Sequence, residues 1–186
     1  MTDSTTLDIP GYKAGTWVLD ASHSEVGFSV RHMMISKVRG HFDIKEATLV
    51  APANPLEAKL DAKVDAASLT TKDEGRDVHL RSADFFDVEN HPVITFSSTG
   101  VRLEGGDFLV DGDLTIKGIT KPITFTVDFG GFGVDPWGNY KAGATAKTVI
   151  NREDFGLTWN AALETGGVLV GKDVAIELDL QGSIQA

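Results

Sequence analysis

The feature that most limits how this chain can fold is a strict alternation of apolar and charged residues. From position 56 to position 66, Leu, Ala and Val at even positions are separated by Glu, Lys and Asp at odd ones. Successive side chains of a β-strand point to opposite sides, so a period of two is typical of a strand with one buried face. A one-residue shift would bury the five charges, and the register is therefore strongly fixed.

The same alternation recurs along the chain and predicts eight amphipathic strands, with a ninth at Thr16–Asp20. Turn-forming sequences such as Glu104-Gly105-Gly106 separate them. One segment differs: residues 71–74 have the form of a capping box, which predicts a short helix from about Lys72 to Arg81 with Thr71 as its N-cap. Neither a βαβ rhythm nor a linker divides the chain, so the strands are expected to form one sandwich or barrel.

Small residues at inward positions favour a hollow barrel. An eight-stranded barrel is just wide enough for its own side chains, or for one ligand where those side chains are small. Since protein interiors pack densely and apolar voids are destabilising, small inward residues predict an apolar cavity that holds a ligand. The alternative is that they let two sheets approach closely or that they face the helix. The small inward residues are Thr48, Ala58, Ala62, Ala66, Ser98, Gly112, Ala142, Ala144 and Ala146.

Charge and composition exclude several classes of partner. The net charge of −10 is spread over the chain, so nucleic acid is not expected as a partner and an anionic membrane surface is disfavoured. No apolar run approaches the roughly 18 residues of a membrane span, so no stable membrane insertion is expected. The first ten residues lack the basic and apolar regions of a secretory signal, which favours a cytoplasmic location if they are the natural start.

No recognised catalytic or metal-binding pattern is present, and we predict neither kind of site. His23, His32 and His41 are spaced nine apart, which fits no standard zinc signature, and the chain has no Cys. A Gly-x-Ser-x-Gly motif is also missing. Gly130–Gly133 follows a strand but precedes no helix, so it predicts a bend or bulge rather than a phosphate cradle.

The segment Arg76–Val88 is dense in charged and aromatic residues and allows two interpretations. Phe85 and Phe86 could close the barrel mouth around a ligand whose polar head meets Arg76 or Arg81. Alternatively, the aromatic rings plug the end of the barrel as ordinary core residues, with the Arg and Asp side chains in ion pairs.

Six stretches, in order over nearly the whole chain after Gly15, resemble the YceI-like family, lipocalin-like proteins of bacteria. They are Trp17–Phe28, Arg76–Val88, His91–Phe96, Leu114–Pro122, Asn151–Leu157 and Val170–Val174. The resemblance implies an elongated antiparallel barrel that binds polyisoprenoid chains, including quinone-type lipids, often forms homodimers and has no established catalysis. Many relatives are exported to the periplasm, whereas the first residues here carry no export signal.

We therefore expect an all-β fold: an elongated eight-stranded antiparallel lipocalin-like barrel with one short helical excursion. It is expected to comprise residues 15–186, after a flexible N-terminal extension of residues 1–14. The expected function is non-catalytic binding, transport or storage of a polyisoprenoid or quinone-like lipid, with no other cofactor and with a homodimer as a further expectation. The residues expected to bind the ligand are Val26, Phe28, Val30, His32, Phe42, Leu60, Phe85, Phe86, Phe96, Leu114, Phe125, Ala144 and Trp159.

Two other functions remain open at this point. The barrel could be the reaction chamber of an enzyme, with His32, His79 or His91 as an acid–base group near neutral pH. It could also be a stress-response interaction module in which the cavity is incidental.

Overall fold

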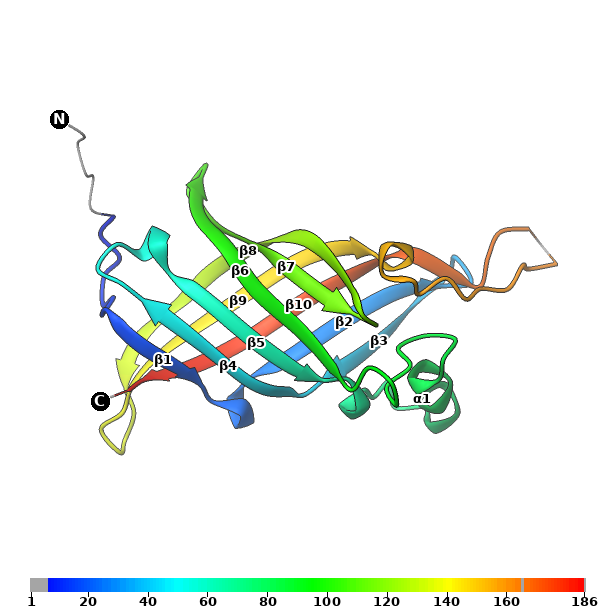
Figure 1. Cartoon of the computed structure of the whole chain (residues 1–186), viewed down its shortest axis with the longest axis horizontal. Coiled ribbons are helices and arrows are strands. Elements are labelled where there is room, and N and C mark those ends of the chain that lie inside the picture. Colours follow the sequence, from blue (N-terminus) through cyan, green and yellow to red (C-terminus); the bar gives the residue numbers. More distant parts are fainter. Residues whose placement is uncertain (1–6, 165, 186) are drawn as a thin grey trace.

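Ten antiparallel strands form one sheet that closes on itself in a computed structural model, which describes residues 7–164 and 166–185 (Figure 1). The single helix among these residues, α1 (Glu74–Arg81), lies at one end of the barrel. The strands are β1 (Gly15–Leu19), β2 (Glu25–His32), β3 (Ser36–Phe42), β4 (Ile44–Ala51), β5 (Lys59–Asp65), β6 (Val93–Glu104), β7 (Asp107–Ile116), β8 (Ile119–Val134), β9 (Tyr140–Asn151) and β10 (Val170–Ile184).

The ten strands fill eight positions around the barrel. Strand β10 pairs with β9 on one side, and on the other side with β2 and then with β1. Strands β1 and β2 therefore share one position, separated by the 3-10 turn Ala21–His23, and β3 and β4 share the next one, separated at Asp43. The pairing of β1 with β10 closes the sheet. The predicted all-β, eight-stranded antiparallel barrel is confirmed.

The alternation predicts most inward positions correctly but fails at a bulge. The register between β4 and β5 shifts between Ile44 and Glu46, and an extra residue in one strand turns the following side chains over. Ala47 is therefore buried, whereas Thr48, which we expected to point inward, is exposed. The expected bulge at Gly130–Gly133 is confirmed, because the register between β8 and β9 shifts between Phe129 and Gly131.

The strand predicted over positions 56–66 is shorter at both ends. Pro55 opens a 3-10 turn whose next amide, that of Leu56, donates to the Asn54 side chain over 3.1 Å. At the other end, the Asp65 carboxylate accepts from the amide of Ala67 over 3.0 Å and starts a second 3-10 turn. Local side-chain bonds of this kind compete with the strand ladder and end β5.

The helix begins later than its sequence indicates. Its N-cap is Asp73, whose carboxylate accepts from the amide of Arg76 over 3.0 Å, and not Thr71. Lys72 has a φ of 63°, so the chain turns sharply between these two residues. Thr71 instead donates its amide and hydroxyl to the buried carboxylate of Asp77, over 2.8 and 2.5 Å.

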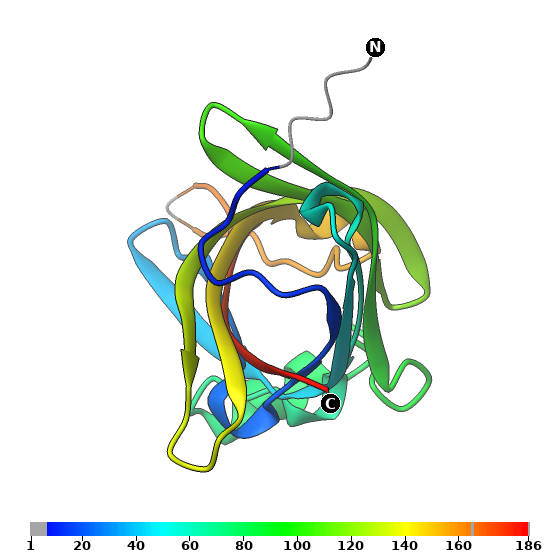
Figure 2. The same cartoon turned by 90° about the vertical axis from the view of Figure 1, so that its left-hand side faces the viewer.

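Residues 9–13 of the N-terminal extension lie against the end of the barrel opposite α1 (Figure 2). The Tyr12 hydroxyl donates to the Pro52 carbonyl over 2.6 Å, and the Tyr140 hydroxyl donates to the carbonyl of Gly11. The Lys13 ammonium lies 3.8 Å from the centre of the Tyr140 ring. Residues 1–6 of the extension lie outside the described residues, and the flexibility expected for the extension as a whole stays a prediction.

The β2–β3 hairpin ends in a tight turn at the same end of the barrel as α1 (Figure 1). The amide of Ile35 donates to the carbonyl of His32 over 3.2 Å, and the two central residues, Met33 and Met34, have φ values of 53° and 63°. Such a turn normally contains Asn-Gly or Gly-Gly, since other residues are strained there. Two methionines at these positions are therefore unusual.

Candidate ligand-binding cavity

A single elongated cavity of about 580 Å³ runs through the barrel. Its wall extends from Tyr12 and Trp17 at one end to His32, Trp159 and Leu169 at the other. Strand β10 alone contributes residues from positions 170 to 182, which is about 40 Å of strand at 3.4 Å per residue. With a strand tilt of about 40°, the cavity is about 30 Å long along the barrel axis. It therefore fits a long, narrow molecule.

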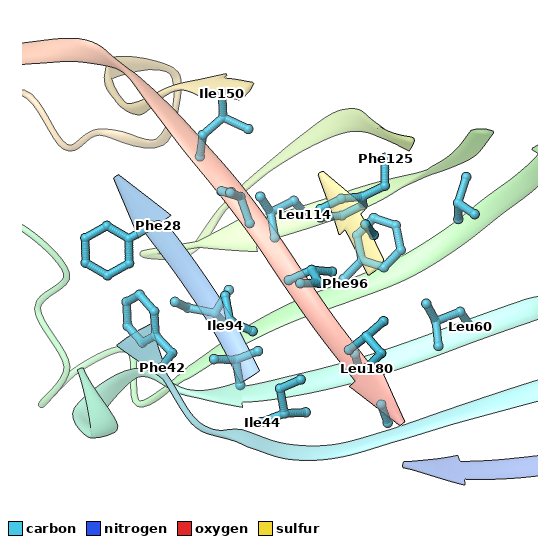
Figure 3. Close-up of a pocket in the computed structure, with 18 of the residues that line it drawn as sticks. Phe28, Phe42, Ile44, Leu60, Ile94, Phe96, Leu114, Phe125, Ile150 and Leu180 are labelled. Atoms are coloured by element: carbon cyan, nitrogen blue, oxygen red, sulfur yellow. The ribbon is translucent and has the colours of Figure 1, made fainter. Parts of the chain in front are cut away.

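The middle of the cavity is lined almost entirely by hydrocarbon. Figure 3 shows side chains from strands on all sides of the barrel pointing into it, among them Phe96, Leu114, Phe125 and Leu180. Ser98 also lies on the wall, but its hydroxyl oxygen already accepts a 2.8 Å hydrogen bond from the amide of Leu60. An apolar molecule in this section would lose little hydrogen bonding and gain burial.

Most of the small inward residues do border the cavity, but some are covered. Ala66 is 1% exposed and lies in a 3-10 turn outside the cavity wall. Gly112 points inward, but the Phe96 ring occupies the space above it, where a Cβ atom would come within 2.4 Å of the ring. Of the small residues predicted to point inward, those that lie on the wall are Ala58, Ala62, Ser98, Ala142, Ala144 and Ala146.

Aromatic rings close the end of the cavity beside α1. Phe85 and His79 pack edge to face, with ring centres 5.1 Å apart, and both contact Trp159 at 5.4 and 4.7 Å. Phe86 packs against Phe42 at 5.3 Å. Phe85 belongs to the buried core, Phe86 is partly buried against it, and both border the cavity, so the two interpretations of Phe85 and Phe86 as plug and as mouth describe the same position.

The charged residues of the dense segment mostly fasten α1 to the chain before it. Arg81 donates to the carbonyls of Ala67 and Leu69 over 3.0 and 2.5 Å and does not line the cavity. The interpretation in which Arg81 meets a ligand head is therefore wrong. Arg76 borders the cavity, and its guanidinium donates to the hydroxyl and carbonyl of Thr71 over 2.7 and 3.0 Å.

Arg152 is a buried charged residue on the cavity wall that the sequence did not identify. Its side chain is 3% exposed and borders the cavity, yet its bonds go to backbone carbonyls: Gly171 at 2.7 Å, Leu157 at 2.5 Å, Trp159 at 2.9 Å and Val170 at 3.3 Å. Burial lowers its pKa, and nearby Glu153 opposes that shift. Arg152 thus ties the loop that carries Trp159 to β10. The only sequence indication was its place in the family-like stretch Asn151–Leu157.

The opposite end of the cavity is also closed by aromatic residues. Trp17 packs against Phe132 and Tyr140, with ring centres 6.0 and 5.9 Å apart, and donates its indole NH to the Lys13 carbonyl over 3.1 Å. The Tyr12 hydroxyl, whose pKa is raised by burial, donates to the Pro52 carbonyl at this end. The sequence did not indicate that Ile9 and Tyr12 border the cavity, because the extension has no periodic pattern.

The structure brings the whole predicted ligand-binding set together on this one wall. Their contact with a ligand stays a prediction. The set is Val26, Phe28, Val30, His32, Phe42, Leu60, Phe85, Phe86, Phe96, Leu114, Phe125, Ala144 and Trp159.

The three histidines considered for catalysis do not share a site. His32 and His79 line the cavity, whereas His91 does not. The Nε2 atom of His79 lies 2.9 Å from the carboxylate of Asp84, a residue that does not line the cavity. Within the described residues, no three His, Asp or Glu side chains are grouped to hold a metal ion. The same part of the chain contains no helix with the length and apolar content to cross a bilayer.

Comparison with known proteins agrees with this architecture. The model of the YceI-like domain matches residues 17–182, and the chain belongs to this family. It is 41% identical over 170 residues to the UPF0312 protein SA2479 of Staphylococcus aureus, covering 90% of this chain and 97% of that protein.

Two solved structures share the fold. The crystal structure of Burkholderia cenocepacia BcnA superposes with a TM-score of 0.75 at 24% identity, covering 88% of this chain and 98% of the other. A polyisoprenoid binding domain from Saccharophagus degradans, implicated in plant cell wall breakdown, has a TM-score of 0.68 at 16% identity. That alignment covers 93% of this chain and all of the domain.

Proposed function

We propose that the barrel binds one long isoprenoid-type lipid, a polyisoprenoid or a quinone with such a tail, and carries or stores it without chemical change. The observation that carries this proposal is the cavity itself: about 580 Å³, narrow, and hydrocarbon-lined along its middle. Membership of the YceI-like family supports it, as does the shared fold with a protein described as a polyisoprenoid binding domain. Apolar burial at roughly 25 cal/mol per Å² would supply the affinity.

The distribution of polar groups supports one orientation of the lipid. His32, Arg76 and His79 border the cavity near α1, whereas Trp17 and Phe132 close the other end. Imidazole and guanidinium groups donate hydrogen bonds to carbonyl or hydroxyl oxygens. We therefore place the oxygen-bearing head of the lipid near α1 and the end of its tail beside the N-terminal segment.

Native mass spectrometry of the protein purified from its own host tests the proposal directly. We expect a non-covalent apolar adduct that organic extraction releases and whose mass identifies an isoprenoid series. A protein that is consistently free of lipid, and that does not bind solanesol added from cyclodextrin, would contradict it.

The absence of catalysis is part of the proposal and is tested separately. His32 and His79 remain the two histidines on the cavity wall, and neither is part of a recognisable triad. We expect His32→Gln and His79→Gln to leave the chemical form of the bound lipid unchanged. A product made by the wild-type protein and lost in either variant would replace the carrier function with an enzymatic one.

A further inference from the structure

The β2–β3 turn exposes a group of large apolar side chains beside the polar end of the cavity. Met33, Met34 and Ile35 are 43%, 62% and 79% exposed, and Val168 on the neighbouring loop is 37% exposed. We call these four residues the apolar tip. Three consecutive exposed apolar residues are unfavourable in water unless they serve a contact, and here two of them also have positive φ.

The apolar tip is continuous with the cavity wall. The amide of Met33 donates to the carbonyl of Leu169 over 2.7 Å, and the Met34 side chain lies next to Gly167. His32 and Leu169, which directly adjoin the tip in sequence, both line the cavity. A surface in contact with the tip therefore lies close to the end of the cavity where we place the lipid head.

The charge around the tip differs from that of the whole protein. The net charge of the chain is −10, yet positions 26–42 contain Arg31, Lys37 and Arg39 and no Asp or Glu. Arg31 lies directly opposite Lys37 across the hairpin, and all three cations are exposed. Among the described residues, no carboxylate lies within ion-pair distance of any of them.

Like charges directly opposite each other in a hairpin are destabilising, so their presence here indicates a role other than stabilising the fold. Cations on an edge strand also discourage pairing with another chain, and β3 is such a strand. Edge protection accounts for Lys37 and Arg39 but not for an apolar tip, which would encourage association. On the neighbouring β10, Lys172 is paired with Glu153, and Asp173, Glu177 and Asp179 give the strand a net charge of −2. Glu177 and Asp179 lie opposite Gly27 and Glu25, away from the turn, so Asp173, together with Glu164 on the loop that carries Val168, is set against the three cations of the hairpin.

We propose that the apolar tip docks the barrel on an anionic phospholipid surface, with Met33, Met34 and Ile35 entering the head-group region and Arg31, Lys37 and Arg39 facing lipid phosphates. Arg31 and Lys37 lie two residues behind the turn, which is about 7 Å along the hairpin. Side chains that anchor a protein in the interface typically reach about 5–10 Å deep. The spacing therefore places the cations at the level of the phosphates.

This inference rests on the proposed function, because a carrier of membrane-resident lipid must meet the membrane near the end of the cavity through which its cargo passes. Docking is reversible and local, and so differs from stable insertion. The net charge disfavours approach of most of the surface to an anionic membrane, and this orients the barrel tip first.

Vesicle flotation tests the docking. We expect the wild-type protein to float with mixed phosphatidylcholine–phosphatidylglycerol vesicles, less with pure phosphatidylcholine, and less at high salt. The double variant Met33→Asn/Met34→Gly removes apolar surface while supplying the residues that this turn prefers, so it keeps the fold. We expect it to bind mixed vesicles about tenfold more weakly. This loss of affinity corresponds to a modest fraction of the free energy gained by fully burying two such side chains. Lys37→Gln/Arg39→Gln should weaken binding to mixed vesicles only.

The matched control is Trp137→Ser, which removes a side chain that is 83% exposed in the β8–β9 turn, outside the apolar tip. We expect this variant to bind vesicles like the wild type. Equal binding by the Met33→Asn/Met34→Gly variant, or loss of binding in Trp137→Ser alone, would overturn the docking proposal. So would a tip variant that dissociates a dimer in sedimentation without changing vesicle binding, which would assign the tip to a second copy of the chain.

Titration of the same variants with solanesol, without vesicles, separates this inference from the proposed function. We expect the tip variant to bind solanesol as the wild type does, because its substitutions lie outside the cavity wall. A wild-type protein that takes up solanesol but ignores vesicles refutes docking and leaves the carrier function in place. One that binds vesicles but no isoprenoid refutes the carrier function.

Discussion

Filling the middle of the cavity should shorten the lipid that the barrel accepts. Ala144 on β9 lies between Phe129 of β8 and Leu180 of β10, and all three border the cavity. In Ala144→Phe, the ring displaces about six carbon groups of a bound tail, each worth ~0.8 kcal/mol when buried. If the tail cannot move aside, the loss is about 5 kcal/mol, or between three and four orders of magnitude in affinity.

The loss should depend on chain length, which distinguishes steric exclusion from general damage. Solanesol, whose nine isoprene units occupy the whole length of the cavity, should bind far more weakly to Ala144→Phe, whereas farnesol can still occupy the end beside α1. Quenching of tryptophan fluorescence reports both titrations, since Trp159 lines the cavity. Thr145→Phe is the matched control, because it places the same ring on the exposed face of the same strand. We expect it to leave the affinities for solanesol and farnesol unchanged.

The stability of the lipid-free variant completes the test. A ring that enters empty space should leave the melting temperature unchanged or raise it, whereas an overpacked interior would lose about 1–3 kcal/mol. Equal solanesol affinity in Ala144→Phe and the wild type would refute the reasoning, because the space would not be the tail site. A strongly destabilised Ala144→Phe would show that the cavity does not exist at this position.

Three further changes test the structure that supports the cavity. Arg152→Lys should lower the free energy of unfolding by about 3 kcal/mol, because buried carbonyls lose charged donors. Calorimetry should then show a melting temperature lower by roughly 6–12 °C, and a change below about 2 °C would contradict the role of Arg152 in holding the loop to β10. Gly112→Ala should be less stable by about 1–3 kcal/mol in urea unfolding, since its Cβ would lie 2.4 Å from the Phe96 ring; Gly100→Ala, with open space around it, is the control and should differ little. Hydrogen bonds from Ser22, His23 and Lys141 lower the pKa of Asp20 in the folded protein below its value in the unfolded chain. The ionised Asp20 therefore stabilises the fold above about pH 4, and this stabilisation is lost as the pH falls further. Asp20→Asn should therefore destabilise the protein at neutral pH, with the difference from wild type narrowing in acid; a constant difference down to about pH 2 would refute the linkage.

The sequence was sufficient for the parts of the site that lie on regular strands. Val26, Phe28 and Val30 alternate with polar residues, and this period alone places them on one face of a strand. The inward alanines of β9 followed in the same way, and with them the cavity. Thr48 was misplaced because a bulge is a local change of register that leaves no mark in the period.

The ends of the cavity could not be predicted for a different reason. The contacts of Tyr12 with Pro52 and of Arg152 with four carbonyls join residues through the closed fold, and no local pattern encodes them. The capping residue of α1 was misassigned because both Thr71 and Asp73 suit an N-cap. The choice between them depends on Asp77, which takes Thr71 as a hydrogen-bond donor.

The pairing of β10 with β1 and β2 closes the barrel, and it also determines when the barrel can close during synthesis. Strands β1 and β2 complete their pairing only with β10, which is synthesised long after them. Until then the nascent sheet is open, exposes its apolar face and has two unpaired edges, and such long-range strand pairing is slow. The proposed lipid could therefore be enclosed in two ways, by wrapping during synthesis or by entry through an end afterwards. A chain truncated before Val170 keeps seven of the eight strand positions and encloses nothing.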